Sequence, residues 1–345
     1  MHKMKKEIIE QPIVLKQSYE KNIGKIEVIA KNILDREIDN IIFVARGSSD
    51  NAAIYGKYLI EILSGIPVGL AAPSVASIYK KNLKLDNTCV IGVSQSGQSE
   101  DICNFIEMAN KSGAMTAAIT NTPNSRLANC AQYTIDMNVG VEEAVAATKT
   151  FTAEILLLEL LAALLGKRDD IINELSMIDE IVKRALGLEE KIKNEVVKFR
   201  YVSECFILGR GIVYPLALEF ALKIQETSYV RAKGFSTSDF MHGPIAMIER
   251  NIPVFILALN DETIENSIRI VNKLTEEKVD VIAFSDIDEV KEKSFIYFAI
   301  DKELGKFIKP LFMVPVIQMF SYYLCVAKGY DPDTPRLLSK VTITK

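Results

Sequence analysis

Three hydroxyl side chains and a glycine follow an apolar run near residue 90. The stretch reads S-Q-S-G-Q-S-E-D and contains Ser94, Ser96, Gly97 and Ser99. Hydroxyl groups, and the backbone N–H groups that a glycine leaves accessible, are donors that suit an anion with several oxygens. A helix N-cap ahead of Glu100 would use only the hydroxyl of Ser99. The stretch therefore predicts an anion-binding loop at the end of a strand.

A second polar turn, R-G-S-S, follows another apolar run and adds the hydroxyls of Ser48 and Ser49. The chain contains neither the G-x-G-x-x-G of dinucleotide sites nor the G-K-[ST] of Walker phosphate sites. Many neutral donors without a lysine clamp favour a small phosphorylated sugar over a nucleotide. Arg46, in the same turn, has two open interpretations: a solvated side chain or a substrate contact.

Two further places could supply acid–base chemistry. Glu219, Lys223 and Glu226 are spaced i, i+4, i+7 and share one face of a predicted helix. A carboxylate there could carry a proton between neighbouring carbons, although an exposed stripe of salt bridges explains the same spacing. His242 lies in F-M-H-G-P, a glycine-proline loop where a histidine packed in the core is less expected. Its imidazole suits proton transfer near neutral pH.

The elements that must position these residues occur twice. Arg46 and Arg210 set an offset of 164 residues between I-I-F-V-A-R-G-S-S and C-F-I-L-G-R-G-I-V. The same offset aligns three more apolar runs, beginning at Cys89 and Pro253, Met115 and Val279, and Gln132 and Ile296. Four strand signals in register indicate an internal duplication. Because continuous Val/Ile runs alternate with amphipathic helices, we predict an α/β fold of two tandem doubly wound parallel-sheet sandwich domains.

Composition narrows the class of protein. The 345 residues include 41 Lys and Arg against 45 Asp and Glu, a net charge of −4, which argues against nucleic-acid binding. The N-terminus lacks the apolar region of a signal peptide, and the longest apolar run, interrupted by Glu159, is too short for a bilayer. We expect a cytoplasmic protein without a membrane partner. Five cysteines without C-x-x-C spacing favour buried free thiols, and only two histidines argue against a metal site.

Motifs along nearly the whole chain resemble those of tandem sugar isomerase (SIS) proteins of the glucosamine-6-phosphate synthase type. S-Q-S-G-Q-S resembles the family's S-Q-S-G-E-T phosphate loop, and A-R-G-S-S resembles its A-C-G-T-S turn. Four more segments are similar to family motifs: V-A-A-T-K-T-F, L-E-F-A-L-K-I-Q-E-T-S-Y, M-H-G-P and P-R-L-L-S-K-V-T-I. The expected division is an N-terminal segment (1–20), a first SIS domain (21–166), a helical connector (167–199), a second SIS domain (200–329) and a C-terminal tail that closes the active site (330–345).

The resemblance implies a site for a small-molecule sugar phosphate that needs no cofactor. It assigns proton transfer to Glu226 with support from Lys223, and ring opening to His242, supplied by the neighbouring subunit of a homodimer. Lys340 resembles a lysine that can form an imine with the open-chain ketose; a role in closing the site and a plain surface lysine are the other interpretations. The resemblance also implies a set of substrate-binding residues: Ser48, Ser49, Ser94, Gln95, Ser96, Gly97, Ser99, Val145 and Ser339.

Departures from the synthase pattern refine the expected activity. No cysteine precedes Cys89 to serve as the nucleophile of an amino-terminal glutaminase, so we expect no glutamine-dependent activity. R-G-S-S-D-N-A-A and S-Q-S-G-Q-S-x-D resemble stand-alone amino-sugar-phosphate deaminases. We expect a metal- and nucleotide-independent deaminase/isomerase that converts glucosamine 6-phosphate to fructose 6-phosphate and ammonia by ring opening and C1–C2 proton transfer. The alternatives are a fructosamine-6-phosphate deglycase, another phosphosugar isomerase, and a non-catalytic sugar-phosphate sensor.

Overall fold

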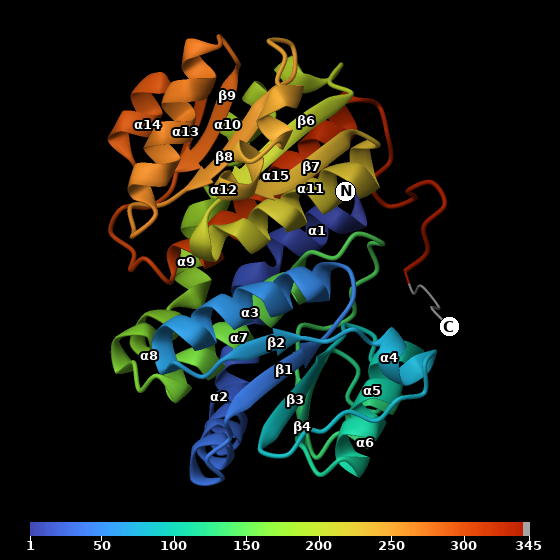
Figure 1. The fold of residues 1–345 in the computed structure, drawn as a ribbon. Helices are drawn as coiled ribbons and strands as arrows, with labels where there is room; N and C mark the ends of the chain where they lie inside the picture. Colours follow the sequence, from blue (N-terminus) through green and yellow to red (C-terminus); the bar gives the residue numbers. More distant parts are fainter. Residues whose placement is uncertain (341–345) are drawn as a thin grey trace. The chain divides into compact units, whose positions relative to one another are not determined.

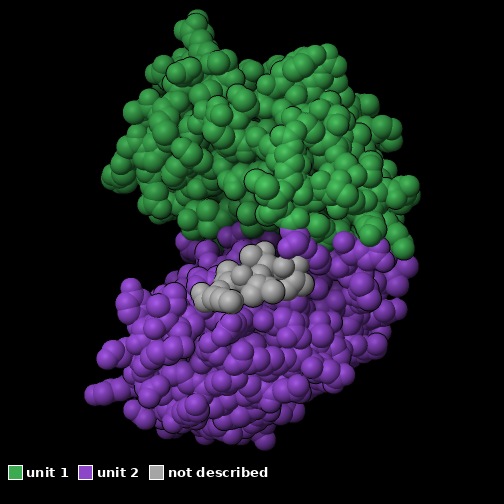
Figure 2. Space-filling view, turned by 90° about the vertical axis from the view of Figure 1, so that its right-hand side faces the viewer, with its two compact units in different colours: residues 1–9, 144–148, 180–338 green, residues 10–143, 149–179, 339–345 purple. Residues whose placement is uncertain are grey.

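The computed structural model describes residues 1–340; the last five residues of the predicted tail, 341–345, lie outside the described part. The chain forms two compact units, each assembled from separate segments and coloured separately in Figure 2. Unit 1 contains residues 1–9, 144–148 and 180–338, and unit 2 contains residues 10–143, 149–179 and, among those described, 339–340.

Unit 2 is built on a five-stranded parallel sheet with the strand order β2-β1-β3-β4-β5 (Figure 1). Its strands are β1 (Asn40–Val44), β2 (Val68–Leu70), β3 (Thr88–Val93), β4 (Met115–Thr120) and β5 (Tyr133–Asp136). Its helices are α2 (Gln11–Asp35), α3 (Ser48–Ser64), α4 (Ser74–Ser77), α5 (Glu100–Lys111), α6 (Arg126–Cys130), α7 (Lys149–Leu165) and α8 (Asp169–Leu175).

The central strands β3 and β4 of unit 2 are buried along their whole length because helices cover both faces of the sheet. Phe43 faces α3 and α7, where a Cβ added to Gly56 would lie 3.2 Å from both the Phe43 ring and the Leu158 side chain. The next residue, Val44, packs in a buried cluster with Ile102 of α5. Successive side chains of a strand point to opposite faces, so both faces of β1 are buried. The predicted doubly wound sandwich is confirmed for this unit.

Unit 1 repeats this architecture around a second parallel sheet, ordered β10-β9-β8-β6-β7. Its strands are β6 (Glu204–Gly209), β7 (Arg231–Ser236), β8 (Val254–Ala258), β9 (Val281–Ser285) and β10 (Ile296–Ala299). Its helices are α1 (Lys3–Ile9), α10 (Glu189–Val196), η1 (Val197–Phe199), η2 (Gly211–Val213), α11 (Tyr214–Ser228), α12 (Thr237–Met241), η3 (Pro244–Met247), α13 (Ile264–Glu276), α14 (Asp288–Lys293) and α15 (Lys309–Ala327). Helix α9 (Ile178–Leu186) begins in the last two residues of the preceding unit 2 segment and continues into unit 1.

Phenylalanines fill both faces of the unit 1 sheet. Phe255 of β8 lies between Phe220 of α11 and Phe320 of α15, with ring centroids 5.5 Å and 5.2 Å away. Phe206 of β6 packs instead against Phe240 of α12, at 5.4 Å between centroids. Edge-to-face and tilted ring pairs of this kind add to the free energy of burial. The second sheet is therefore also covered on both faces.

The strand orders confirm the duplication, because each sheet reads 2-1-3-4-5 in the order of its own strands. All four aligned sequence signals are strands, and β1 and β6 keep the offset of 164 residues at their first residues, Asn40 and Glu204. The strands β2 and β7 were not anticipated. The first is three residues long with two of them exposed, and the second alternates exposed and buried residues, so neither gives a continuous apolar run.

The most hydrophobic helices, α7 and α15, belong to the cores. Every residue of α7 except Leu164 is buried. Within the described part of the chain, α15 is the one helix long and apolar enough to cross a membrane, with a mean hydropathy of 1.6, but 89% of it is buried. Core packing accounts for both helices. All five cysteines are free thiols and four of them are buried, as predicted.

A buried carboxyl group in unit 2 makes stability depend on pH. Tyr55 of α3 donates a 2.7 Å hydrogen bond to Glu159 of α7, and both side chains are fully buried. Burial raises the pKa of Glu159 well above its ordinary value of 4.5, despite the hydrogen bond from Tyr55. The folded state therefore binds a proton that the unfolded state releases above pH 4.5. This contribution is fully present below the unfolded pKa and is lost as the pH rises through the folded pKa.

We predict that Glu159→Gln, which cannot ionise, gains stability relative to the wild type between pH 5 and pH 8. The gain is at most about 1.4 kcal/mol per pH unit, the value of one proton. Urea unfolding at pH 5, 6.5 and 8 checks it, with the exposed Glu27→Gln of α2 as the matched control. Parallel stability–pH curves for wild type and Glu159→Gln would show that the buried carboxyl does not titrate as described.

Candidate active site

The predicted anion loop follows β3 directly. Ser94 is 7% exposed, and its backbone N–H donates to the carbonyl of Ile119 at 3.0 Å, which fixes the start of the loop beside β4. The Ser94 hydroxyl accepts a hydrogen bond from Gly97 N at 3.2 Å, and the Ser96 hydroxyl accepts one from Gln98 N at 3.3 Å. Each hydroxyl oxygen is thereby oriented while its own proton stays available to donate to an anion.

Gly97 is required by the shape of this loop. Its φ is +60°, and a Cβ at this position would lie 2.1 Å from the Ser125 hydroxyl. The carbonyl of Gly97 accepts a 3.0 Å hydrogen bond from Leu127 N, so the loop is tied to α6. Any residue with a Cβ would have to displace either the loop or the start of α6. The glycine thus lets the loop keep the shape in which the Ser94 and Ser96 hydroxyls are oriented.

Ser99 stands at the N-cap position of α5, but it does not cap the helix. Its side chain makes no capping hydrogen bond, and its hydroxyl is buried without a partner among the described residues. The simple explanation of Ser99 as a cap is therefore wrong, although Glu100 and Asp101 do fill the first turn. A buried hydroxyl without a partner carries a desolvation cost that a bound ligand could remove.

The R-G-S-S turn lies at the neighbouring strand end. Arg46 is not simply solvated: its guanidinium pairs with Asp101 of α5 at 2.9 Å and remains half exposed. Burial alone would raise the pKa of Asp101, but hydrogen bonds from Ser77 and Arg46 outweigh burial and lower it. The Arg46–Asp101 pair connects the two predicted loops.

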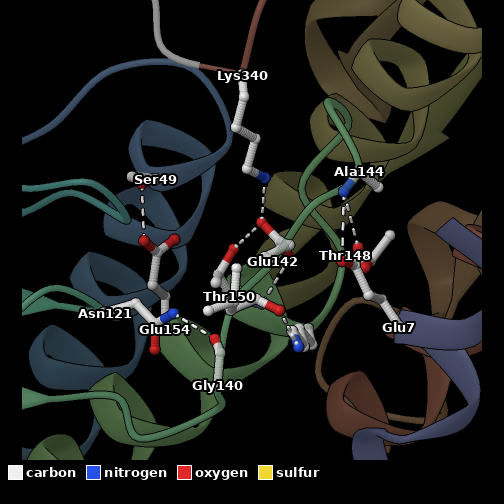
Figure 3. A network of polar contacts seen from close by, with 12 residues as sticks. Glu7, Ser49, Asn121, Gly140, Glu142, Ala144, Thr148, Thr150, Glu154 and Lys340 are labelled. Atoms are coloured by element: carbon white, nitrogen blue, oxygen red, sulfur yellow. Dashed lines mark hydrogen bonds and ion pairs between the residues drawn. The ribbon is translucent and has the colours of Figure 1, made fainter. Parts of the chain in front are cut away.

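The two serines of the R-G-S-S turn differ in their surroundings. Ser48 is the first residue of α3 and is half-buried, whereas the Ser49 hydroxyl donates to Glu154 of α7 at 2.8 Å and is engaged in the core (Figure 3).

An open cavity of about 520 Å³ borders the anion loop in unit 2 and includes Gln95. Asn121, which also lines the cavity, connects two of its segments by hydrogen bonds. Its backbone N–H donates to Gln95 O at 3.0 Å, and its side-chain amide donates to Gly140 O at 2.7 Å. The same cavity reaches Glu142, whose buried carboxylate accepts a 2.6 Å hydrogen bond from Lys340 (Figure 3). Lys340 therefore contacts Glu142, which lines the same cavity as Gln95.

Sequence reasoning missed Asn121 and Glu142. Asn121 follows β4, so its place at the carboxyl end of a strand beside the anion loop was a usable signal. Glu142 is one of two consecutive glutamates in a loop, and no local pattern separates it from its neighbour. Ser339, the residue before Lys340, is exposed.

Unit 1 holds the predicted acid–base residues on α11. Lys223 is 1% exposed and bridges Glu226 at 2.5 Å and Glu219 at 3.4 Å. The alternative of an exposed salt-bridged stripe is wrong, because Glu219 is fully buried as well. Glu226 is the member that reaches the surface, with 22% of its side chain exposed. A carboxylate fixed by a buried ammonium group at a surface position is suited to proton transfer with a bound molecule.

His242 follows α12 and is exposed. Its backbone N–H donates to Asp239 O at 3.1 Å, and the next residue, Gly243, has a φ of +139°. Among the described residues no hydrogen bond to its imidazole is found, which leaves both ring nitrogens open to another group. Val145 lies in the short segment 144–148 of unit 1 and is partly buried.

Comparison with known proteins agrees with this fold. The family model for the SIS domain matches twice, at residues 36–164 and 199–328. The chain belongs to the SIS domain family. This SIS protein is 33% identical to the glutamine–fructose-6-phosphate aminotransferase (isomerizing) of Methanothermobacter thermautotrophicus, over 98% of this chain and 57% of the relative. It therefore spans little more than half of the curated relatives it matches.

Solved structures extend the comparison. The C-terminal domain of glucosamine-fructose-6-phosphate aminotransferase from Francisella tularensis matches with a TM-score of 0.88 and 29% identity, covering 97% of this chain and 98% of that domain. Glucosamine-6-phosphate deaminase from Thermotoga maritima matches with a TM-score of 0.78 at 23% identity, covering 99% of this chain and all of that one, and shows a shared fold. The predicted tandem SIS architecture is confirmed, and the chain is a homologue of sugar-phosphate isomerases.

The two SIS units carry different parts of the predicted site. Unit 2 collects the anion-binding residues and the tail lysine, and unit 1 collects the acid–base residues. Within unit 2, hydrogen bonds connect Gln95, Asn121 and Gly140, and a separate pair joins Glu142 to Lys340. Within unit 1, Lys223 and Glu226 are in contact. The roles of these residues in binding and catalysis remain predictions.

Proposed function

We propose that this SIS protein is an amino-sugar-6-phosphate deaminase/isomerase that converts glucosamine 6-phosphate to fructose 6-phosphate and ammonia. The observation that carries the proposal is the position of Glu226, which is partly exposed while Lys223, its partner, is buried. The ammonium group of Lys223 holds the carboxylate in one place without blocking its outer side. A binding-only protein has no need of such an arrangement.

The proposed reaction balances with water as the second substrate. After ring opening, Glu226 takes the proton from C2 of the aldehyde form and negative charge develops on O1. The same carboxyl returns the proton to C1 while O1 takes a proton from the nitrogen on C2, which leaves a C1 hydroxymethyl group and a C2 imine. Water adds to C2 and ammonia departs, giving the 2-ketose phosphate. The imidazole of His242 would transfer the proton needed for ring opening.

The phosphate would be held by the donors of the anion loop. Ser94 and Ser96 offer oriented hydroxyls, Gly97 allows the tight shape of the loop, and Ser99 contributes a buried hydroxyl without a protein partner in the described chain. Hydrogen bonds from neutral donors to an anion are among the stronger hydrogen bonds in proteins. This set suits a sugar phosphate and leaves the ring open to chemistry.

We further propose that the working unit is a homodimer in which His242 acts in the neighbouring subunit's site. Its exposure and the absence of a described hydrogen bond to its ring support this. Most soluble oligomers are symmetric, so a twofold dimer is the simplest assembly. No metal ion or nucleotide takes part in the proposed reaction, and a chelator should leave the rate unchanged.

An ammonia-release assay with glucosamine, galactosamine and fructosamine 6-phosphates tests the proposal. We expect ammonia and an equal amount of fructose 6-phosphate from glucosamine 6-phosphate. Release of an amine from fructosamine 6-phosphate alone would identify a deglycase instead. Binding of all three without turnover would identify a sugar-phosphate sensor. Synthesis of glucosamine 6-phosphate from glutamine would contradict the deaminase assignment.

The loop predicts a specific binding defect. Ser94→Ala and Ser96→Ala should each weaken sugar-phosphate binding by roughly one to two decades, because a hydrogen bond to a charged group is worth about 1.5–3 kcal/mol. Isothermal titration with glucosamine 6-phosphate measures the change, and Ser112→Ala, at the far end of α5, is the matched control. Unchanged affinity in both variants would place the phosphate elsewhere.

A further inference from the structure

Two cysteines of unit 2 lie together behind the anion loop. Cys103 belongs to α5 and Cys130 is the last residue of α6, and these two helices pack side by side (Figure 1). Cys103 is fully buried, whereas Cys130 is partly exposed and packs against the buried cluster that contains Cys103. The two thiols also form a side-chain hydrogen bond with each other. The structure therefore places two free thiols within reach of one another.

Both thiols contact the backbone that shapes the anion loop. Cys103 Sγ donates to Gly97 O at 3.7 Å, and this carbonyl also accepts the 3.0 Å hydrogen bond from Leu127 N. Cys130 Sγ donates to the carbonyl of the same Leu127 at 3.3 Å. The loop is tightly packed here, because a Cβ at Gly97 would lie 2.1 Å from the hydroxyl of Ser125, the N-cap of α6. A displacement of either thiol therefore acts on Gly97.

Of the two thiols, Cys130 is the one that reacts more readily. The hydrogen bond from Cys103 and the nearby guanidinium of Arg126 lower the pKa of Cys130, against the opposing effects of burial and of Glu107. The same hydrogen bond and burial raise the pKa of Cys103. Burial alone raises the pKa of Cys89 to about 12. Because the thiolate is the reactive form of cysteine, the partly exposed Cys130 is the preferred target of an oxidant.

We propose that Cys130 and Cys103 form a peroxide-sensitive modification site, in which oxidised Cys130 is captured by Cys103 as a disulfide that loosens the anion loop. The Cys130 thiolate first attacks one oxygen of hydrogen peroxide, which breaks the O–O bond and gives a sulfenic acid and hydroxide. The Cys103 thiol then attacks the sulfenic sulfur, and its proton leaves with the departing hydroxide as water. In total the two thiols lose two protons and two electrons, and one peroxide is reduced to two waters.

The disulfide changes the support of the anion loop. Cys103 loses the S–H proton that Gly97 O accepts, and both sulfur atoms move from hydrogen-bond contact to bonding distance, which shifts α5 against α6. The Ser94 and Ser96 hydroxyls depend on the shape of this loop for their orientation. This consequence rests on the proposed function: oxidation would weaken sugar-phosphate binding and make the enzyme respond to peroxide. Formation of the disulfide does not depend on that function.

Peptide mapping after peroxide treatment tests the modification. The full chain is treated with hydrogen peroxide, blocked with iodoacetamide and digested without reductant. We expect a Cys103–Cys130 disulfide that dithiothreitol reverses, while Cys89, Cys205 and Cys325, whose pKa values burial raises to about 12, stay reduced. Cys130→Ser should form no disulfide, and Cys103→Ser should leave a sulfenic acid on Cys130 that dimedone traps. A wild type in which Cys130 stays reduced, or in which Cys103 stays reduced after Cys130 is oxidised, would overturn the proposal.

Two measurements on the reduced and the disulfide-linked protein test the effect on the loop. We expect about tenfold weaker binding of glucosamine 6-phosphate after oxidation, the change expected when one hydrogen bond to an anion is lost, and recovery with dithiothreitol. Hydrogen exchange of residues 94–99 should become faster, and this readout needs no ligand. Peroxide-treated Cys130→Ser is the control and should change in neither. Equal exchange in both forms would overturn the effect on the loop. If glucosamine 6-phosphate is not turned over, the proposed function fails, while mapping and exchange still decide this proposal.

Discussion

Glu226→Gln is expected to lower kcat for glucosamine 6-phosphate by about 10²–10⁴-fold, the usual contribution of a positioned general base. The amide keeps the size of the side chain and can still accept a hydrogen bond from Lys223, but it cannot accept the C2 proton. Because the proposed phosphate donors belong to another part of the chain, the affinity for the sugar phosphate should change by less than about threefold. Steady-state kinetics and titration calorimetry measure the two effects separately.

The matched control for this variant is Glu276→Gln at the exposed end of α13, which should behave as the wild type. A thermal melt is needed as well, since Lys223 is buried and loses a charged partner. A correctly folded Glu226→Gln protein with kcat within tenfold of the wild type would exclude Glu226 as the proton carrier.

Mixing two inactive variants is expected to restore activity if His242 acts across a dimer interface. In a heterodimer of Glu226→Gln and His242→Ala chains, one site combines the wild-type Glu226 of one chain with the wild-type His242 of the other. Such a heterodimer should regain about half the activity of a wild-type dimer. Differently tagged chains, exchanged and purified through both tags, allow the measurement.

Two tagged forms of Glu226→Gln, exchanged in the same way, provide the control and should stay inactive. A purified heterodimer without activity would place His242 in the site of its own chain or outside catalysis. A protein that remains monomeric at assay concentration while turning over substrate would contradict the dimer proposal altogether.

The fold was predictable where local sequence decides structure. Strands buried on both faces must be largely apolar, so β1, β3 and β4 and their counterparts were visible as apolar runs, and the common offset of 164 residues also identified β5 and β10. The strands β2 and β7, at the equivalent edges of the two sheets, were not visible, because their own residues form no continuous apolar run. Their pairing depends on the neighbouring strand rather than on their own composition.

The candidate site shows the same limit. Ser94, Ser96 and Gly97 were found because a loop of hydroxyls and glycine is a local pattern. The burial of Lys223 was not predictable, since spacing i, i+4, i+7 is the same on an exposed and a covered helix face, and only the packing of α11 against α15 and β7 decides between them. Glu142 was not predicted as a site residue for a further reason: its partner Lys340 lies 198 residues away in the sequence.

The central claim is that this SIS protein moves a proton between C2 and C1 of an amino sugar phosphate through Glu226. Proton NMR of glucosamine 6-phosphate incubated in D₂O follows that step directly. With the wild type we expect loss of the substrate C2–H signal, fructose 6-phosphate carrying deuterium at C1 wherever the carried proton exchanges with solvent, and one ammonium ion per ketose formed; with Glu226→Gln we expect none of these on the same timescale. Persistence of the C2–H signal with the wild type, or its loss at an equal rate with Glu226→Gln, would contradict the account.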